Sequence, residues 1–161
     1  MAMLAEGVIT ELNRKSPNYS KMVEEVVKME KKIFPKHESL SRSFDDELSK
    51  KNAGLLYAYV NGEVAGYAMY SCPTSLQALI SKLAVKEKYR RQGYGEALLR
   101  EAIRKCQTRK IQRISLHVDP SRTPAVDLYK KLGFRIDSLV AKYYSADRDA
   151  YRMYLDLSTS E

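Results

Sequence analysis

Apolar residues near the start of the chain recur at helical spacing. The apolar positions that follow Ser16-Pro17 are Met22, Val23, Val26, Val27, Ile33 and Phe34. Ser16-Pro17 places an N-cap residue and a proline at a helix start, and Phe34-Pro35 ends the pattern because proline cannot continue a helix. We therefore predict one helix up to Phe34, and a short second helix from Ser43 to about Lys50.

The spacing of apolar residues changes to alternation near residue 55. Leu55, Tyr57 and Tyr59 alternate, and the strand that follows Asn61-Gly62 extends from Val64 to Tyr70. Asn-Gly favours a type I′ hairpin turn, because both residues tolerate positive φ. A long strand is predicted from Leu76 to Val85. Another is predicted from Ile111 to Val118, with Ile114, Leu116 and Val118 on the face opposite His117.

Helical and strand patterns alternate in the remainder of the chain. One helix is predicted from about Tyr94 to Arg109, and a second from Pro124 to Leu132, capped by Thr123-Pro124 and ended by Gly133 in a left-handed conformation. Residues 134–144 and 151–157 predict a closing antiparallel pair. The order β-α-α-β-β-β-α-β-α-β-β predicts a single α/β domain, residues 1–161, with a mixed sheet. The Leu83 and Ile114 strands are far enough apart in sequence to be parallel.

Composition narrows the class of protein. The chain has 161 residues, 44% hydrophobic and 30% charged, as in ordinary globular domains. No apolar run reaches the ~18 residues of a membrane span, and no secretory signal pattern is visible at the N-terminus. The only cysteines, Cys72 and Cys106, predict reduced thiols and a cytoplasmic protein, with a nuclear location also open. Neither they nor the two histidines have metal-ligand spacing, so we expect no metal site.

The positive charge is concentrated in one part of the chain. Residues 82–113 carry eleven Lys or Arg and three Glu, which equals the net charge of +8 of the whole chain. A basic surface there suits a phosphate-bearing ligand, although the helix charges are equally typical of a solvated face. Nucleic-acid binding is disfavoured, because no aromatic interleaving and no reader motif accompany the charge.

The most informative segment is the turn at residues 90–96. Arg90-Arg91-Gln92-Gly93-Tyr94-Gly95-Glu96 lies between an apolar strand and a helix. Two glycines allow close approach of a ligand to the backbone, and the start of a helix offers N–H groups with a favourable dipole. This combination predicts a cradle for a pyrophosphate.

Three segments resemble the GNAT family of N-acetyltransferases in order and spacing. They are Arg90-x-x-Gly93-x-Gly95, which is similar to that family's acetyl-coenzyme-A signature, Leu116-His117-Val118, and residues 125–134. Tyr143-Tyr144, residues 149–153 and Ile33-Phe34-Pro35 resemble the branch that acetylates protein N-termini, including ribosomal-protein alanine. The resemblance implies a sheet of six to seven strands with a central splayed parallel pair and about four flanking helices.

The resemblance also implies the site residues. Acetyl-CoA, the acetyl donor, would be held by Leu83, Ala84, Val85, Arg90, Arg91, Gln92, Gly93, Tyr94, Gly95 and Glu96. Tyr129 would protonate the departing thiolate, and His117 would act as a base through water. Phe34, Pro35, Tyr143 and Tyr144 would contact the acceptor. Each role has an alternative. Tyr129 could be a core residue whose hydroxyl bonds to the backbone, and one of Tyr143 and Tyr144 could pack in the core.

His117 could be a half-buried histidine without a catalytic role. The base would then be a tyrosine or water.

Three positions depart from the pattern of the family. Arg122 stands where most members carry Asn, Leu79 where one subgroup carries a tyrosine, and Asp147 in a loop that differs in that subgroup. These departures leave the fold unaffected and bear on the identity of the acceptor.

The pKa of the acceptor amine distinguishes an α-amine acceptor from a lysine acceptor. An α-amine has a pKa of about 7.7–8.0 and needs little help to lose its proton, whereas a lysine amine at ~10.4 needs a strong base. The sequence shows no strong base, which favours a protein or peptide α-amine. Protein lysine or a small amine, such as a polyamine or an amino acid, is the alternative acceptor. A non-catalytic acyl-CoA-binding or interaction domain is the alternative of another class. The acceptor's identity, an auxiliary subunit and the oligomeric state stay open.

Overall fold

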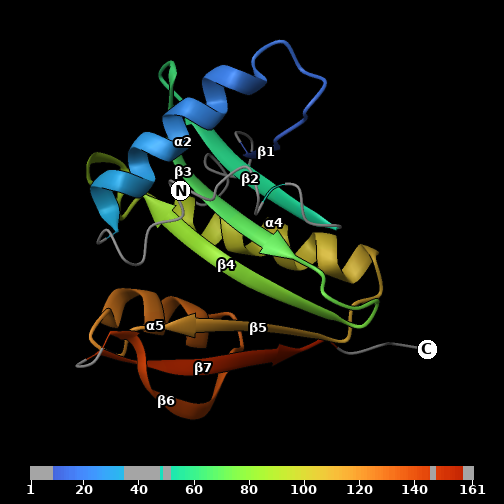
Figure 1. The fold of residues 1–161 in the computed structure, drawn as a ribbon, viewed down its shortest axis with the longest axis vertical. Coiled ribbons are helices and arrows are strands. Elements are labelled where there is room, and N and C mark those ends of the chain that lie inside the picture. The colour runs from blue at the N-terminus through green and yellow to red at the C-terminus, as the bar shows by residue number, and fades with distance from the viewer. Residues whose placement is uncertain (1–8, 35–47, 49–51, 146–147, 158–161) are drawn as a thin grey trace.

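Seven strands form one mixed sheet in the order β1-β2-β3-β4-β5-β7-β6 (Figure 1). The computed structural model describes residues 9–34, 48, 52–145 and 148–157. The strands are β1 (Ile9–Glu11), β2 (Ala53–Val60), β3 (Glu63–Ser71), β4 (Gln77–Val85), β5 (Arg113–Val118), β6 (Arg135–Ser145) and β7 (Arg148–Asp156). Only β4 and β5 pair in parallel, which confirms the predicted crossover and the α/β class.

Three α-helices pack on this sheet in the described residues. Helix α2 (Tyr19–Ile33) covers one face, and α4 (Tyr94–Thr108) and α5 (Thr123–Lys131) cover the other. The amphipathic pattern explains this arrangement: Met22 and Val26 of α2 are buried on one side, and Leu98 and Leu99 of α4 are fully buried on the other. Each such side chain contributes ~1.5–3 kcal/mol on burial. The predicted helix from Ser43 to Lys50 lies outside the described residues except for Leu48, which is helical.

Of the three predicted helix starts in the described residues, Tyr94 of α4 is confirmed and the other two are displaced. The N-cap of α2 is Asn18 rather than Ser16, because a turn with a Tyr19 N–H to Ser16 O bond of 3.1 Å precedes the helix. The N-cap of α5 is Arg122, so Thr123 is the first helical residue. The C-terminal prediction for α5 is confirmed, with Gly133 at φ 102°. The hairpin prediction is also confirmed, since Asn61 and Gly62 both have positive φ.

The parallel ladder between β4 and β5 is short. Paired residues extend only from Gln77 with Arg113 to Ile80 with Leu116, although both strands continue further. The register of β4 against β3 shifts at the same level: Tyr70 faces Ile80 and Met69 faces Lys82, so Ser81 is the extra residue of a β-bulge. A bulge bends and twists its strand. β4 therefore leaves β5 at this level, as the resemblance implied for the splayed pair.

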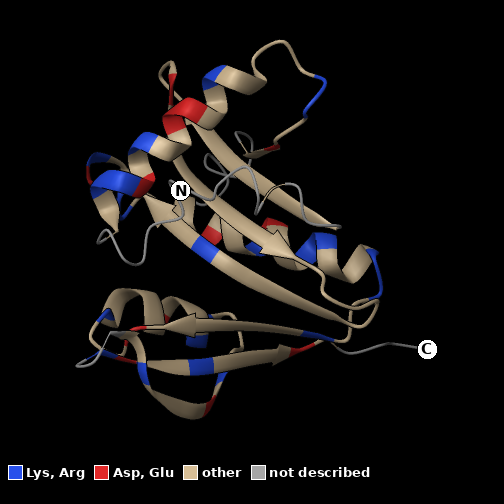
Figure 2. Cartoon of the chain, in the orientation of Figure 1, with Lys and Arg blue, Asp and Glu red and all other residues tan. Residues whose placement is uncertain are grey.

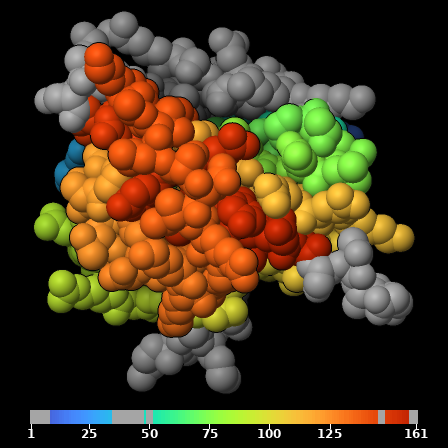
Figure 3. Space-filling view, turned by 90° about the horizontal axis from the view of Figure 1, so that it is seen from below, coloured from blue at the N-terminus to red at the C-terminus, as the bar shows by residue number. Residues whose placement is uncertain are grey.

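The C-terminal strands and α5 occupy the face of the molecule seen from below (Figure 3). β6 is one of the two edge strands of the sheet, and Ile136 and Leu139 on it are exposed. Charged residues gather on the helices and strand ends, whereas the strands themselves are mostly uncharged (Figure 2).

Ion pairs take up much of the basic segment. Its paired residues are Lys86 and Lys88 with Glu63, Arg100 with Glu96, Arg104 with Glu101, Lys105 with Glu11 and Arg113 with Asp156. A solvated, paired surface therefore accounts for most of these charges. Arg90 and Arg91 have no ion-pair partner among the residues described, and they lie in the turn predicted to bind phosphate.

Candidate active site

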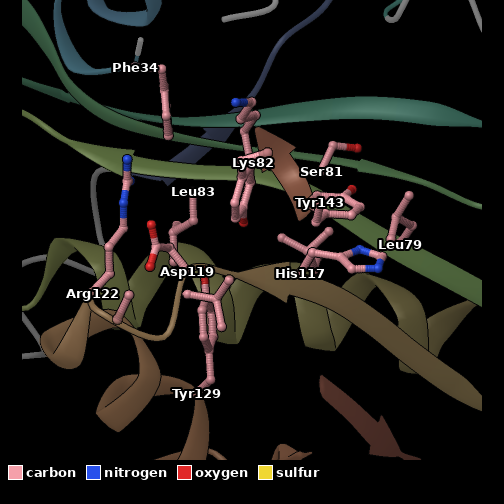
Figure 4. Close-up of a pocket in the computed structure, with 14 residues that line it drawn as sticks. Phe34, Leu79, Ser81, Lys82, Leu83, His117, Asp119, Arg122, Tyr129 and Tyr143 are labelled. Atoms are coloured by element: carbon pink, nitrogen blue, oxygen red, sulfur yellow. The ribbon is translucent and has the colours of Figure 1, made fainter. Parts of the chain in front are cut away.

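A cleft of about 380 Å³ opens where β4 and β5 separate (Figure 4). Phe34 reaches it from the end of α2, and Tyr129 enters from α5 on the opposite side. The lining residues are Phe34, Leu79, Ile80, Ser81, Lys82, Leu83, His117, Val118, Asp119, Arg122, Ala125, Tyr129, Tyr143 and Tyr144. The cleft thus unites both predicted catalytic residues with Leu83 and three of the predicted acceptor residues. Pro35 lies outside the described residues, and Ala84, Val85 and residues 90–96 are not part of this lining.

The glycine turn has the backbone geometry expected of an anion cradle. Arg91 (φ 63°) and Gly93 (φ 89°) are both left-handed, and Gly93 is the N-cap of α4. The first α4 amide with a carbonyl partner is that of Ala97, which donates to Gly93 O at 3.0 Å. Among the described residues, the amides of Tyr94, Gly95 and Glu96 therefore have no carbonyl partner. Such amides at a helix start bind anions, so this turn fits a diphosphate.

Side chains fix this turn from outside the cradle. Arg90 Nε donates to Val85 O at 2.9 Å, which ties the turn to the end of β4 and leaves the terminal guanidinium nitrogens as further donors. The Glu96 carboxylate bonds to Lys131 at 2.7 Å and to Arg100 at 2.9 Å. These two partners lower the pKa of Glu96, Lys131 having the larger effect. Because these two cations partly neutralise the carboxylate, it repels a phosphate bound at the turn less strongly.

Tyr129 is a buried ring whose hydroxyl has no hydrogen-bond partner in the part of the chain that the structure describes. The ring packs edge-on against Phe134 at 5.8 Å, and only 7% of the residue is exposed. No hydrogen bond joins its hydroxyl to another described residue, so the alternative of a core tyrosine bonded to backbone is not supported. Burial raises the pKa of Tyr129 to about 12, against a smaller opposing effect of Arg122. The phenol therefore keeps its proton at neutral pH and is a hydrogen-bond donor in the cleft.

His117 occupies the position that the alternation of β5 predicted. Ile114, Leu116 and Val118 are buried, whereas His117 faces the cleft and stacks on Tyr143 at 4.3 Å with an interplanar angle of 8°. Burial, and secondarily the charge of Arg152, lowers the pKa of His117 below 6.5. The imidazole is therefore neutral at pH 7, which is the form that can accept a proton.

Tyr143 and Tyr144 both line the cleft although they are adjacent in β6. Simple alternation would turn one of them toward the core. Lys142 has φ 57°, and the register between β6 and β7 shifts between Val140 and Ser145, so alternation is interrupted. The two rings meet edge-on at 4.8 Å, and Tyr143 is 47% exposed. Neither tyrosine belongs to the core, and the core alternative for one of them is wrong.

Two cations lie on the ring of Phe34. Lys82 Nζ is 3.8 Å from the ring centroid, and the Arg122 guanidinium is 5.1 Å from it. Such contacts stabilise by about 0.5–2 kcal/mol. Sequence reasoning singled out Arg122 only as a departure and missed Lys82, because strand spacing does not say which strand residues meet α2.

Asp119 was also missed as a residue of the cleft. The Asp119-Pro120 pair signalled only the end of β5. In the structure Asp119 lines the cleft and accepts hydrogen bonds from Arg148, which lies 29 residues later in the chain. No local motif connects two residues that far apart.

Metal and membrane features are not found in the described part of the chain. No group of three or more His, Cys, Asp or Glu residues there could hold a metal ion. No helix there has the length and apolar character needed to cross a membrane.

Comparison with known proteins identifies the family. Residues 21–134 match the Acetyltransferase (GNAT) family. The chain is 33% identical over 143 residues to an N-alpha-acetyltransferase of Sulfurisphaera tokodaii, covering 81% of this chain and 85% of that protein. It is 33% identical over 101 residues to the ribosomal protein bS18-alanine N-acetyltransferase of Escherichia coli K12, covering 61% and 68%.

Solved structures agree on the fold. The crystal structure of the ribosomal-protein-S18-alanine N-acetyltransferase from Escherichia coli superimposes with a TM-score of 0.77 at 24% identity, covering 95% of this chain and 96% of that one. The family match spans α2 to α5 and includes the glycine turn, the β4–β5 split and Tyr129. The chain belongs to the GNAT family of acetyltransferases.

Proposed function

We propose that the protein transfers an acetyl group from acetyl-CoA to the α-amine of a protein or peptide. The observation that carries the proposal is the joint arrangement of the split strands, the Tyr129 hydroxyl that is unpaired among the described residues, and neutral His117 in one cleft. The names of the relatives support the same acceptor class, since they are N-alpha and ribosomal-protein-alanine acetyltransferases.

The turn at residues 90–96 would hold the diphosphate of acetyl-CoA. Amides of Tyr94, Gly95 and Glu96 provide hydrogen bonds, and Arg91 adds positive charge. The parallel ladder ends at Ile80, so β4 from Leu83 to Val85 has no partner strand on the side facing β5, although Val85 O accepts a hydrogen bond from Arg90 Nε. The backbone groups of this segment are suited to bind the amide-bearing arm as an added strand would.

Bound acetyl-CoA supplies the acetyl group as a thioester, whose C–S bond breaks as the new C–N bond forms. His117 accepts the proton that the attacking amine loses, directly or through one water. Tyr129 donates a hydrogen bond to the leaving sulfur. Because its pKa of about 12 makes it a weak acid, it stabilises the developing charge and passes its proton only as the bond breaks.

Charges in the cleft disfavour a polyamine as acceptor. The lining contains Lys82 and Arg122, and its carboxylate Asp119 is already paired with Arg148. A polyamine site would need several carboxylates, and the cluster that follows Phe34 in the sequence, Glu38, Asp45, Asp46 and Glu47, lies outside the described residues. Within the described lining, a second positive charge on the acceptor would be repelled.

Product analysis tests the acceptor class directly. The protein is incubated with acetyl-CoA and a mixture of peptides that each carry a free α-amine and one internal lysine, together with spermidine. We expect mass spectrometry to place the acetyl group on the α-amine, and peptides with a blocked N-terminus to stay unmodified. Acetylation confined to lysine side chains or to spermidine would refute the proposal.

His117 gives a separate prediction through pH. The acceptor amine has to be neutral, so log kcat/KM should rise with slope about 1 as pH increases toward ~8. Below the lowered His117 pKa the slope should increase to about 2, because the base is then protonated as well. His117→Gln should lower kcat/KM by about 10²-fold at pH 7.5 and keep slope 1 throughout. An unchanged break in the variant would assign the base to another titratable group, and a wild-type profile with slope 1 throughout would leave water as the base.

A further inference from the structure

We propose that Asp119 and Arg148 are positioning residues, whose ion pair holds Tyr143 and Tyr144 in place as a wall of the acceptor cleft. The effect on acceptor binding rests on the proposed function. The positioning itself is a property of the fold and can be measured without an acceptor.

Among the described residues of β6 and β7, regular backbone pairing does not extend to this wall. The β6–β7 ladder is regular at Leu139 with Tyr151 and at Val140 with Ala150, and the next pair is Ser145 with Arg148. Between them the ladder is interrupted, and Lys142 N–H donates to the Asp149 carboxylate at 2.9 Å instead. Tyr143 and Tyr144 lie in this interruption, so side-chain contacts have to determine where their rings stand.

The ion pair supplies a rigid attachment to β5. Arg148 Nη2 and Nε donate to Asp119 Oδ2 at 2.6 and 3.2 Å, and the two side chains are only 25% and 13% exposed. Asp119 Oδ1 accepts bonds from Ser121 N–H at 2.9 Å and Ser121 Oγ at 2.8 Å, which orients the carboxylate. Burial raises the pKa of Asp119, but the bonds from Arg148 and Ser121 outweigh it, so its pKa is lowered and the carboxylate is charged at neutral pH.

The attachment continues through rings to the predicted base. The Arg148 guanidinium lies 5.0 Å from the Tyr144 ring centroid, Tyr144 meets Tyr143 at 4.8 Å, and Tyr143 stacks on His117 at 4.3 Å. Asp119 and His117 are two residues apart on the same strand end. The contacts therefore close a ring, in which the ion pair and the His117–Tyr143 stack each connect the wall to the end of β5.

The chain contains a matched control at the opposite end of the same strands. Arg113 at the start of β5 donates to Asp156 at the end of β7 through Nε at 2.7 Å and Nη2 at 3.3 Å. Arg113 also lies 4.3 Å from the ring of Tyr154, just as Arg148 lies over Tyr144. Neither Arg113 nor Asp156 lines the cleft. Asp156→Asn thus removes a similar ion pair without touching the wall.

Kinetics of three variants test the proposal. Asp119→Asn should raise the peptide KM about tenfold and leave the acetyl-CoA KM within about twofold, because a wall displaced by ~1 Å weakens acceptor positioning. Asp156→Asn should leave both unchanged. Arg148→Gln should raise the peptide KM, and adding Asp119→Asn to it should have no further effect, since both changes break one interaction. Equal effects of Asp119→Asn and Asp156→Asn, or additive effects at residues 119 and 148, would overturn the proposal.

A spectroscopic readout keeps the test independent of the acceptor. The chain has two histidines, so the ring protons of His117 can be assigned by comparison with His37→Gln. Stacking on Tyr143 should shift the His117 signals upfield in the wild-type protein. Asp119→Asn should move them toward the values of a free histidine, and Asp156→Asn should not. Unmoved signals in Asp119→Asn would refute the positioning role, whether or not the wild-type protein acetylates peptides.

Discussion

Replacement of Tyr129 by phenylalanine is expected to lower kcat by about 10²–10⁴-fold, with the acetyl-CoA dissociation constant nearly unchanged. The ring would keep its contact with Phe134, since phenylalanine fills the same space apart from the hydroxyl. That hydroxyl has no hydrogen-bond partner among the described residues, so its loss leaves no buried protein group unsatisfied. Stability should therefore be unaffected, and the loss should appear in turnover alone. Steady-state kinetics, calorimetric binding of acetyl-CoA and a thermal melt together check this result.

Tyr70→Phe provides a control with the opposite expectation. Tyr70 is not part of the cleft lining, and its hydroxyl donates to Glu11 Oε2 at 2.6 Å. Its removal deprives a partly buried carboxylate of a hydrogen bond, which should cost about 1–3 kcal/mol in the free energy of unfolding. Turnover per folded molecule should stay near wild type. If Tyr129→Phe instead lost stability and kept its turnover, Tyr129 would be a packing residue, and the non-catalytic alternative would regain support.

Local sequence patterns predicted most of the fold because they encode local physics. The alternation around His117 placed that side chain on the correct face of β5, and Asn61-Gly62 specified the positive φ values of its turn. The Gly93-Tyr94-Gly95 segment indicated an N-terminal helix cradle, since glycine and unpaired helix amides act within a few residues. These features need no knowledge of which strands are neighbours.

The splayed pair was expected from the family resemblance, but the residues that shape the cleft in detail depend on long-range contacts and were not predicted. The bulge at Ser81 exists because β4 must follow β3 while it leaves β5, and nothing in residues 79–83 announces it. The left-handed Lys142 is likewise invisible in sequence, yet it turns two adjacent tyrosines into one wall. The Asp119–Arg148 pair joins the end of β5 to the start of β7. Sequence reasoning thus brought forward the groups now proposed to carry the chemistry and missed those proposed to position them.

The two partners of Phe34 illustrate how a local rule is broken at the site. Arg122 is the N-cap of α5, where the positive end of the helix dipole disfavours a cation, and its side chain makes no capping hydrogen bond. Its guanidinium instead reaches across the cleft to the ring of Phe34. A residue that is locally unfavourable and faces a cleft is typical of a functional position. Arg122, which departs from the family pattern, therefore lies in the part of the cleft where the acceptor would enter.

Substitution of Gly95 by alanine is expected to raise the acetyl-CoA KM by roughly 10–100-fold while the fold stays intact. A Cβ added there would lie 3.6 Å from Leu128 Cδ2 and 3.7 Å from Val85 Cγ2, which are ordinary van der Waals distances. The free protein therefore accommodates the methyl group, and alanine is a better helix former than glycine. The same methyl group would project between the end of β4 and α5, into the space where the amide-bearing arm is expected to run. Calorimetric titration with acetyl-CoA and a thermal melt measure the two effects.

Gly66→Ala separates a glycine required for packing from one required for binding. A Cβ at Gly66 would lie 2.7 Å from the Ala84 carbonyl oxygen, 3.1 Å from Val85 and 3.2 Å from Leu98. Overpacking of this kind costs about 1–3 kcal/mol, which lowers Tm by several degrees at ~2–4 °C per kcal/mol. Gly95→Ala should instead show wild-type or higher Tm together with weakened acetyl-CoA binding. If Gly95→Ala bound acetyl-CoA with wild-type affinity, the acetyl donor would not pass between Val85 and Leu128. The proposal that the turn at residues 90–96 holds the diphosphate would then have to be abandoned.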